Sequence, residues 1–179
     1  MVWFAAGISL KCLQKKLPGF AVVRAMPNNP CLVGAGITAL VKGRGVSRAQ
    51  YQKAEAIFKT VGEVVAVPEK WMDAVTGLSG SGPAFVYAVI EALTKGGIAS
   101  GLPEKVAAKL ALLTVFGAAE TVRKTGRSPR ELREMVVSPG GTTIEGLLVM
   151  DKFKVAEALA RAVAAAAEKS KILSRRLEK

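Results

Sequence analysis

Residues 62–83 read GEVVAVPEKWMDAVTGLSGSGP, and the predicted structure of the chain changes within this stretch. Val64, Val65 and Val67 are typical of a β-strand, and Pro68 ends it. No later segment has a strand pattern, and Pro83 stands where a long apolar helix begins. The sequence therefore predicts an α/β segment over residues 1–68 and an all-helical domain over residues 69–179.

The α/β segment alternates short strands and helices. Strand patterns cover residues 20–26, 36–41 and 64–67, and a further strand ends at residues 3–6. Leucines at helical spacing predict a helix over residues 8–17, and Ser47 caps a second helix that runs through Val61 and stops at Gly62. This alternation is typical of a parallel α/β sheet, but the strands are too few to close one. We therefore expect the chain to begin in the middle of a domain.

The second domain is predicted to consist of helices at residues 83–96, about 103–124 and about 153–176. Pro103 takes the first helical position of its helix. Two capping boxes mark further helix starts, Ser128 with Glu131 and Thr142 with Glu145. Helices this apolar need partners on more than one side, so we expect a second subunit to cover part of them.

The chain is strongly basic, with 26 lysine and arginine residues against 14 aspartate and glutamate residues and a net charge of +12. This excess is compatible with nucleic acid, an anionic membrane or an anionic small substrate. Much of it lies in two runs: Lys11, Lys15 and Lys16, and then Lys169, Lys171, Arg175, Arg176 and Lys179. We interpret the runs as exposed helix faces. Nucleic acid is disfavoured because no aromatic residues are interleaved to stack on bases.

Histidine is absent, and Cys12 and Cys31 stand apart without metal-ligand spacing. We therefore predict no metal site and no histidine-dependent nucleophile. The first residues lack the features of a signal peptide, and no uncharged apolar run reaches the roughly 20 residues that span a bilayer. We expect a soluble cytoplasmic protein with reduced thiols and no membrane partner.

Two glycine-rich segments are the candidate sites. In Thr76-Gly77-Leu78-Ser79-Gly80-Ser81-Gly82-Pro83, the glycines and serines permit tight turns and amide donors directed at an anion, with close helix packing as an equal alternative. In Ser138-Pro139-Gly140-Gly141-Thr142-Thr143, free amides and hydroxyls suit a small carboxylate at a helix N-terminus, whereas N-capping by Thr142 explains the same residues without a ligand. Neither Gly-x-Gly-x-x-Gly nor a phosphate-binding Gly-Lys-Ser or Gly-Lys-Thr occurs.

Three motifs, in this order, closely resemble the pyrroline-5-carboxylate reductase family. They are Met26-Pro27-Asn28 with Pro30, Asp73-Ala74-Val75-Thr76-Gly77-Leu78-Ser79-Gly80-Ser81-Gly82-Pro83-Ala84, and Ser138-Pro139-Gly140-Gly141-Thr142-Thr143-Ile144-Glu145-Gly146-Leu147. The resemblance spans nearly the whole chain. It implies a mainly α protein with a partial α/β N-terminal segment. Residues 1–68 would be the C-terminal remnant of a dinucleotide-binding Rossmann domain, and residues 69–179 a helical dimerisation and substrate-binding domain.

The resemblance also implies an activity. The family's members are oxidoreductases of proline biosynthesis that reduce 1-pyrroline-5-carboxylate, a cyclic imine, to L-proline with hydride from NADPH or NADH. They dimerise through interleaved helices and often assemble into a decamer. Hydride transfer to an imine needs orientation and a proton source more than a strong base, so a site without histidine is acceptable.

The site residues follow from the same resemblance. Thr76 resembles the catalytic threonine near the imine nitrogen, and Glu69 resembles a substrate or product contact. In the family, a strand-end turn lies beside the nicotinamide half of the cofactor, and the segment Ala5, Ala6 and Gly7 resembles it. The substrate carboxylate is expected on the segment of residues 138–143, at Ser138, Gly140, Gly141, Thr142 and Thr143.

The chain departs from the family pattern at Asn29, where threonine is usual, and at Gly126-Arg127-Ser128, where an acidic residue and a histidine are common. The family's first strands and glycine fingerprint also have no counterpart. We therefore expect the dimerisation core and most of the imine pocket, but no NADPH binding by the chain unaided. Two rival functions stay open: a non-catalytic helical oligomerisation module, and a basic polyanion-binding protein.

Overall fold

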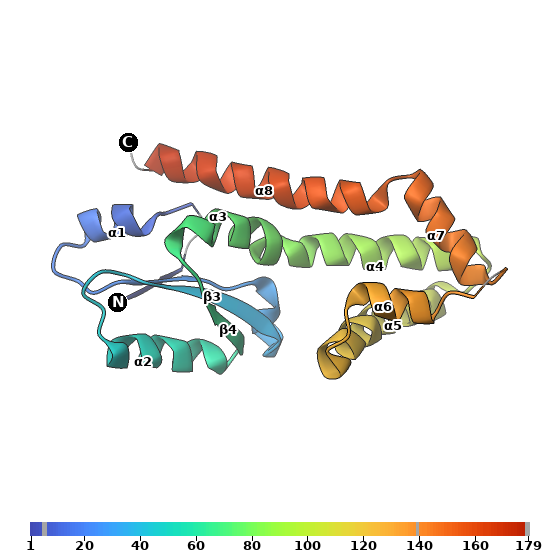
Figure 1. Ribbon diagram of the computed structural model, residues 1–179, viewed down its shortest axis with the longest axis horizontal. Coiled ribbons are helices and arrows are strands. Elements are labelled where there is room, and N and C mark those ends of the chain that lie inside the picture. Colours follow the sequence, from blue (N-terminus) through green and yellow to red (C-terminus); the bar gives the residue numbers. More distant parts are fainter. Residues whose placement is uncertain (5–6, 139, 178–179) are drawn as a thin grey trace. The chain divides into compact units, whose positions relative to one another are not determined.

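The computed structural model describes residues 1–4, 7–138 and 140–177. They form two compact units, Met1–Pro83 with Ala160–Lys179, and Ala84–Leu159. The first contains the strands, several shorter helices and most of the last helix, and the described residues of the second are helical with connecting turns (Figure 1). A mainly helical chain with a small N-terminal sheet confirms the predicted fold class. The domain boundary after residue 68 stays a prediction.

One mixed sheet lies in the first unit, with its strands in the order β1 (Val2–Phe4), β2 (Val23–Met26), β3 (Gly36–Lys42) and β4 (Gly62–Ala66). β1 pairs with β2 in parallel and β3 with β4 in parallel, whereas β2 and β3 are antiparallel. The prediction of a parallel sheet is therefore wrong at this central pair. Only a short 3-10 helix, η1 (Asn29–Val33), joins β2 to β3, and a parallel pair needs a crossover of about a dozen residues or more.

The two faces of the sheet pack against different helices. Helix α2 (Arg48–Lys59) covers one face, where the buried cluster comprises Val23, Ala25, Leu40, Val46 and Ala54. Helix α1 (Leu10–Lys16) and the helical segment after β4 cover the other, where the cluster comprises Leu10, Leu13, Val22, Ala39, Val41 and Met72 (Figure 1). Because side chains alternate along a strand, residues 22, 24 and 26 share this second face.

Helix ends follow the local signals with small shifts. Ser47 caps α2 as predicted, in a capping box with Gln50. Ser9 caps α1 by accepting a hydrogen bond from the Cys12 amide. Gly62 is not the stop of α2, which ends at Lys59. It is instead the first residue of β4, with a φ of 149°.

The helices that follow residue 81 are α4 (Gly82–Ala99), α5 (Glu104–Thr125), α6 (Pro129–Met135), α7 (Thr142–Lys152) and α8 (Val155–Leu177). The Ser128–Glu131 capping box of α6 is confirmed. Pro103, however, is the N-cap of α5 and not its first helical residue. Large apolar side chains are exposed on α4, α5 and α7, among them Val86, Tyr87, Leu93, Leu110, Leu113, Phe116, Leu148 and Val149. Exposed apolar patches of this kind mark interaction surfaces.

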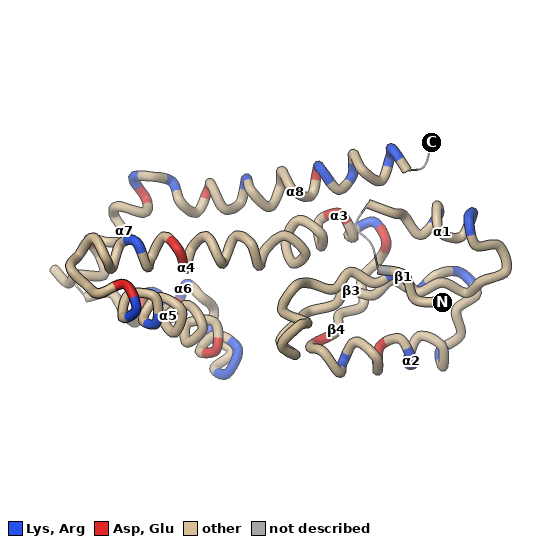
Figure 2. The backbone as a smooth tube through the Cα atoms, turned by 180° about the vertical axis from the view of Figure 1, so that it is seen from behind, with Lys and Arg blue, Asp and Glu red and all other residues tan. Residues whose placement is uncertain are grey.

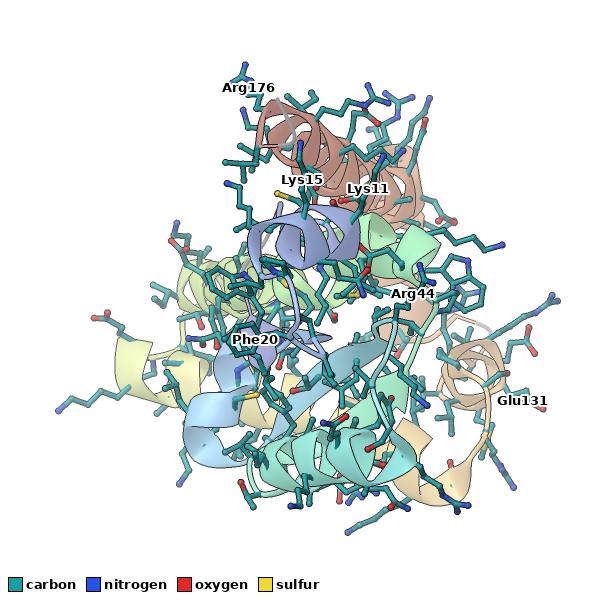
Figure 3. All side chains as sticks on the ribbon, turned by 90° about the vertical axis from the view of Figure 1, so that its left-hand side faces the viewer. Lys11, Lys15, Phe20, Arg44, Glu131 and Arg176 are labelled. Atoms are coloured by element: carbon teal, nitrogen blue, oxygen red, sulfur yellow. The ribbon has the colours of Figure 1, made fainter. Side chains whose placement is uncertain are left out.

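The two basic runs lie close together in the first unit. Cys12 Sγ of α1 is 3.5 Å from the carbonyl oxygen of Leu177 at the end of α8. The basic residues of α1 are lysines, and those of α8 are lysines and arginines (Figure 2). Lys11 and Lys15 project to the same side as Arg176 (Figure 3). Among the described residues, no helix combines the length and the apolar character needed to cross a membrane.

Candidate active site

The predicted site residues Glu69 and Thr76 lie on one continuous helical segment. It begins as a 3-10 turn, η2 (Glu69–Trp71), continues as α3 (Met72–Val75) and ends as a π-helix, η3 (Thr76–Gly80). Glu69, Asp73 and Thr76 are spaced i, i+4 and i+7, which places them on one side of a helix. We call this side the 69–76 face. A π-helical turn of this kind is often found at functional sites.

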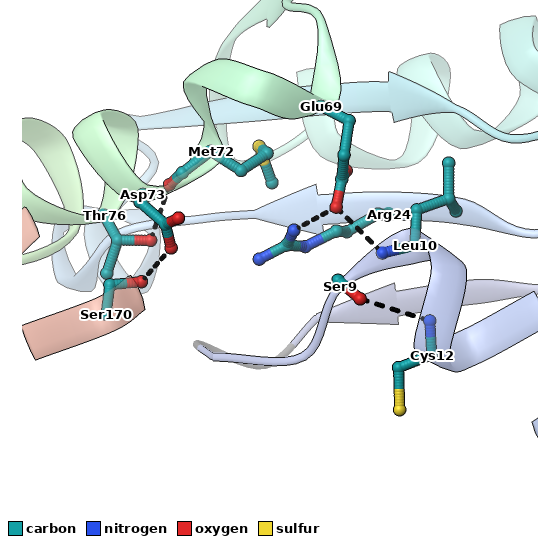
Figure 4. Close-up of polar contacts among 9 residues, drawn as sticks. All are labelled: Ser9, Leu10, Cys12, Arg24, Glu69, Met72, Asp73, Thr76 and Ser170. Carbon is teal, nitrogen blue, oxygen red and sulfur yellow. Dashed lines mark hydrogen bonds and ion pairs between the residues drawn. The ribbon is translucent and has the colours of Figure 1, made fainter. Parts of the chain in front are cut away.

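At the start of this face, Glu69 joins three elements. Its Oε1 atom accepts a hydrogen bond from Arg24 Nη1 at 2.5 Å and another from the Leu10 amide at 2.8 Å (Figure 4). Arg24 is on β2 and is 2% exposed, whereas the Glu69 side chain is 33% exposed. The carboxylate is therefore fixed from the sheet and from α1, and among the described residues its buried second oxygen, Oε2, has no hydrogen-bond partner.

At the other end, Thr76 is 8% exposed, and its hydroxyl donates to the Met72 carbonyl oxygen at 2.8 Å. With its proton engaged, the Thr76 oxygen can accept a hydrogen bond from a ligand N–H. Asp73, between the two, accepts a hydrogen bond from Ser170 Oγ of α8 at 2.7 Å (Figure 4). The last helix thus supports the face that carries Thr76.

Two glycines of the first glycine-rich segment, Gly77 and Gly80, lie close to neighbouring segments. A Cβ atom on Gly77 would come within 2.6 Å of the Val163 carbonyl oxygen and 2.8 Å of the Ala167 amide nitrogen. One on Gly80 would meet Met26 Cε at 2.7 Å. The Ser81 amide donates to the Thr76 carbonyl oxygen at 2.9 Å, as a π-helix requires. The segment is therefore helical, and the packing interpretation accounts for Gly77.

The segment of residues 138–143 lies in the second unit. Ser138 and Gly140 are exposed, Gly140 has a φ of 69°, and the Gly141 amide donates to the Ser138 carbonyl oxygen at 3.0 Å. Helix α7 begins at Thr142 with Gly141 as N-cap, and the described residues show no side-chain hydrogen bond at this cap. The predicted capping box of Thr142 with Glu145 is therefore wrong, because the helix begins one residue earlier than that box requires. A glycine N-cap leaves the first-turn amides without a side-chain acceptor.

Ser138 also lines a hollow between α6 and α7. Its lining includes Arg133, Glu134 and Asp151, so it carries both signs of charge. Among the described residues, no three His, Cys, Asp or Glu side chains are grouped so that they could hold a metal ion.

Of the residues predicted to contact the cofactor, Gly7 is described, and Ala5 and Ala6 lie outside the described residues. Gly7 follows β1 with a φ of 75°, and a Cβ atom there would come within 2.9 Å of Leu173 Cβ. The end of a parallel strand is where open α/β sheets bind ligands.

Sequence reasoning did not find Arg24, Asp73 or Ser170 as site residues. Arg24 carried a signal, since an arginine interrupts the apolar strand pattern of residues 21–26. Ser170 carried none, because a serine in a charged helical tail is unremarkable until its partner 97 residues away is known.

Residues 69–173 match the family described as pyrroline-5-carboxylate reductase dimerisation. A pyrroline-5-carboxylate reductase of Synechocystis is 50% identical over 171 residues, which are 96% of this chain and 64% of that protein. The Arabidopsis thaliana enzyme of the same name is 44% identical over 97% of this chain and 63% of its own length. The chain therefore spans slightly less than two thirds of these relatives.

The fold is also similar to that of solved structures. A crystal structure of Plasmodium falciparum pyrroline carboxylate reductase with NADP bound has a TM-score of 0.93 and 34% sequence identity, and the match covers 97% of this chain and 71% of that one. A Coxiella burnetii pyrroline-5-carboxylate reductase has a TM-score of 0.91 and 36% identity, covering 97% and 65%.

Proposed function

The chain belongs to the pyrroline-5-carboxylate reductase family, and from this we propose that it provides the substrate-binding and dimerisation part of an oxidoreductase that reduces 1-pyrroline-5-carboxylate to L-proline. The observation that carries the proposal is the 69–76 face, where an anchored carboxylate and a nearly buried threonine hydroxyl lie on one side of a helical segment. We propose residues 69–179 as the helical domain of this enzyme, which starts where the family match starts.

Thr76 is the proposed catalytic residue. The imine nitrogen must gain a proton when the ring carbon receives a hydride. Because the Thr76 hydroxyl already donates to the Met72 carbonyl, its oxygen is oriented to accept the N–H of the protonated imine. This contact would hold the reacting C=N bond in place, and orientation of this kind is a major source of rate enhancement.

The segment of residues 138–143 is the proposed site of the substrate carboxylate. Among the described residues, no side-chain hydrogen bond caps the start of α7, and the positive end of a helix dipole attracts an anion. Exposed Ser138, with Thr142 and Thr143, adds hydroxyl groups. The uncapped helix start supports this assignment better than the capping alternative does.

A nicotinamide cofactor, NADPH or NADH, would supply the hydride when bound. We propose that Ala5, Ala6 and Gly7 lie beside its nicotinamide half, and the left-handed conformation of Gly7 at the end of β1 supports this. We also propose a homodimer that assembles further into a decamer, and a cytoplasmic location in proline biosynthesis. The exposed apolar side chains of α4, α5 and α7 support the dimer, and the free thiols of Cys12 and Cys31 suit a reducing compartment.

A second candidate is a non-catalytic oligomerisation module, because the matched family is the one described by dimerisation. To separate the two, the purified chain is mixed with pyrroline-5-carboxylate and NADPH, first alone and then with a separately expressed N-terminal Rossmann domain of a related reductase. Cofactor oxidation in either mixture supports the reductase. No oxidation in both, with a dimer in solution, supports the module.

A further inference from the structure

Glu69 connects the helical segment of the site to the start of α1. Its Oε1 atom accepts a hydrogen bond from the Leu10 amide at 2.8 Å, across 59 residues of sequence. Leu10 is the first residue of α1 and is 9% exposed. The first amides of a helix find no acceptor within the helix itself. An acceptor at position 69 therefore satisfies a largely buried amide of another element.

Neither oxygen of this carboxylate is left for a ligand. Oε1 accepts a second hydrogen bond, from Arg24 Nη1. Oε2 is buried, so the exposed part of the Glu69 side chain does not include it. A buried ion pair of this kind is weak evidence for stability, because an apolar pair of similar volume is often at least as stable. The contact with the Leu10 amide accounts for Glu69 better than ligand binding or stability does.

The start of α1 adjoins the strand-end turn at Gly7, which we propose beside the nicotinamide. Helix α8 forms a second link between this turn and the 69–76 face. A Cβ atom on Gly7 would come within 2.9 Å of Leu173 Cβ, and Ser170, about one turn earlier on α8, donates a hydrogen bond to Asp73. The turn and the face are thus held together along two routes, through the Leu10 amide and through α8.

The relative placement of these two parts matters for the proposed reaction. The ring carbon must lie within reach of the hydride donor beside Gly7 while the ring nitrogen contacts Thr76. Because Glu69 and Thr76 belong to one continuous helical segment, the contact that fixes the start of the segment also fixes Thr76. A misplacement of about 1 Å can cost on the order of 100-fold in rate.

We propose that Glu69 is a positioning residue for hydride transfer, which holds the strand-end turn at Gly7 in place relative to Thr76 through the Leu10 amide. This inference rests on the proposed function. It gives Glu69 a role without ligand contact, in place of the substrate or product contact that the resemblance implies. The acceptor oxygen of the side chain should then matter more than its charge.

Two double variants separate the acceptor from the charge. The acceptor variant combines R24M with E69Q, and its glutamine oxygen can still accept from the Leu10 amide. The apolar variant combines R24M with E69M, which is similar in length but has no such acceptor. Each removes the buried ion pair as a whole and leaves no buried charge unpaired. Both should therefore be folded at the assay temperature, as checked by circular dichroism.

Turnover is measured in the mixture that oxidises NADPH. We expect the apolar variant to lower kcat by about ten-fold or more and the acceptor variant by less than about three-fold. KM for pyrroline-5-carboxylate should stay within about two-fold in both, since the segment of residues 138–143 is unchanged. With NADPH deuterated at the transferred position, the isotope effect on kcat should be larger for the apolar variant. A smaller folded fraction would lower kcat without changing the isotope effect.

Hydrogen exchange of the Leu10 amide, followed by NMR on the full chain, tests the contact without turnover. The amide should exchange at least about ten-fold faster in the apolar variant than in the acceptor variant. Equal exchange, equal kcat or an equal isotope effect in the two variants would overturn the role of Glu69. No NADPH oxidation by the unmodified chain, alone or with the Rossmann domain, would instead overturn the proposed function and this inference with it.

Discussion

Ser170 Oγ donates a hydrogen bond to Asp73 Oδ1 at 2.7 Å, across 97 residues of sequence. Ser170 is 2% exposed on α8, and Asp73 lies on α3 one turn before Thr76. The end of the chain is thereby joined to the face that carries the proposed catalytic threonine. The Ser170–Asp73 hydrogen bond therefore supports both the packing of α8 and the position of the 69–76 face.

Removal of this contact should reduce stability. We expect S170A to lower the free energy of unfolding by about 1 kcal/mol, the net value of a typical hydrogen bond, in urea titrations followed by circular dichroism. S174A, on the same helix, is the control and should stay within about 0.5 kcal/mol of the unmodified chain. Equal stabilities for S170A and S174A would show that the Asp73 contact contributes nothing.

Gly77 should not tolerate a methyl group. In G77A the new Cβ meets backbone atoms of Val163 and Ala167 at 2.6 and 2.8 Å, and a helix backbone cannot easily yield. Overpacking of this kind costs about 1–3 kcal/mol, measured as the free energy of unfolding. G96A is the matched variant, since no atom lies within 4 Å of a Cβ there. It should gain about 0.5–1 kcal/mol from helix propensity.

The hydroxyl of Thr76 should matter for turnover more than for folding. T76V keeps the branched shape but removes the hydroxyl. We expect it to lower kcat by about 10–100-fold in an active mixture with NADPH, because it loses the charge-assisted hydrogen bond that holds the C=N bond in place. T76S should retain most of the rate. If T76V turns over as fast as the unmodified chain, Thr76 is not the catalytic residue.

A side-chain cap on α7 should compete with the substrate carboxylate. Gly141 has a φ of −80°, which any residue adopts, and a new Cβ would meet the flexible Ser138 side chain and, at 3.1 Å, the Ser138 carbonyl oxygen, in both variants alike. G141D would place a carboxylate on the first-turn amides, which should stabilise the helix by a few tenths of a kcal/mol and weaken proline binding. G141A, without an acceptor, is the control. Equal binding by the two variants contradicts a carboxylate site at this helix start.

The capping box of α6 should be sensitive to pH. Hydrogen bonds from the Ser128 side chain, and then from its backbone amide, lower the pKa of Glu131 from its ordinary value of 4.5. The folded pKa is below the unfolded one, so this contribution is present above about pH 4.5 and is lost as the pH falls through the folded pKa. Loss of the Ser128 N-cap in S128A should cost about 1 kcal/mol at pH 7. The difference in free energy of unfolding between S128A and the unmodified chain should be smaller at pH 3 than at pH 7. An equal difference at both pH values would exclude the link to Glu131.

Local signals predicted most helices and strands to within a few residues. Ser47 and Ser128 cap helices because an N-cap needs only a hydroxyl and the next few amides. The same local reasoning failed at Thr142, where the glycine before it takes the cap. It also failed for the pairing of β2 with β3, which depends on the length and path of the connection rather than on either strand.

The sequence by itself determined the order of elements, the change to helix after Pro68 and, through its motifs, the family and the candidate residues Glu69 and Thr76. These are properties of neighbouring residues, which fix backbone preference and helix capping locally. Tertiary structure alone decided that Arg24 meets Glu69, that Ser170 meets Asp73 and that Gly77 lies against α8. Each of these contacts joins distant segments, and a periodic pattern shows that a residue is buried without showing which residue it meets.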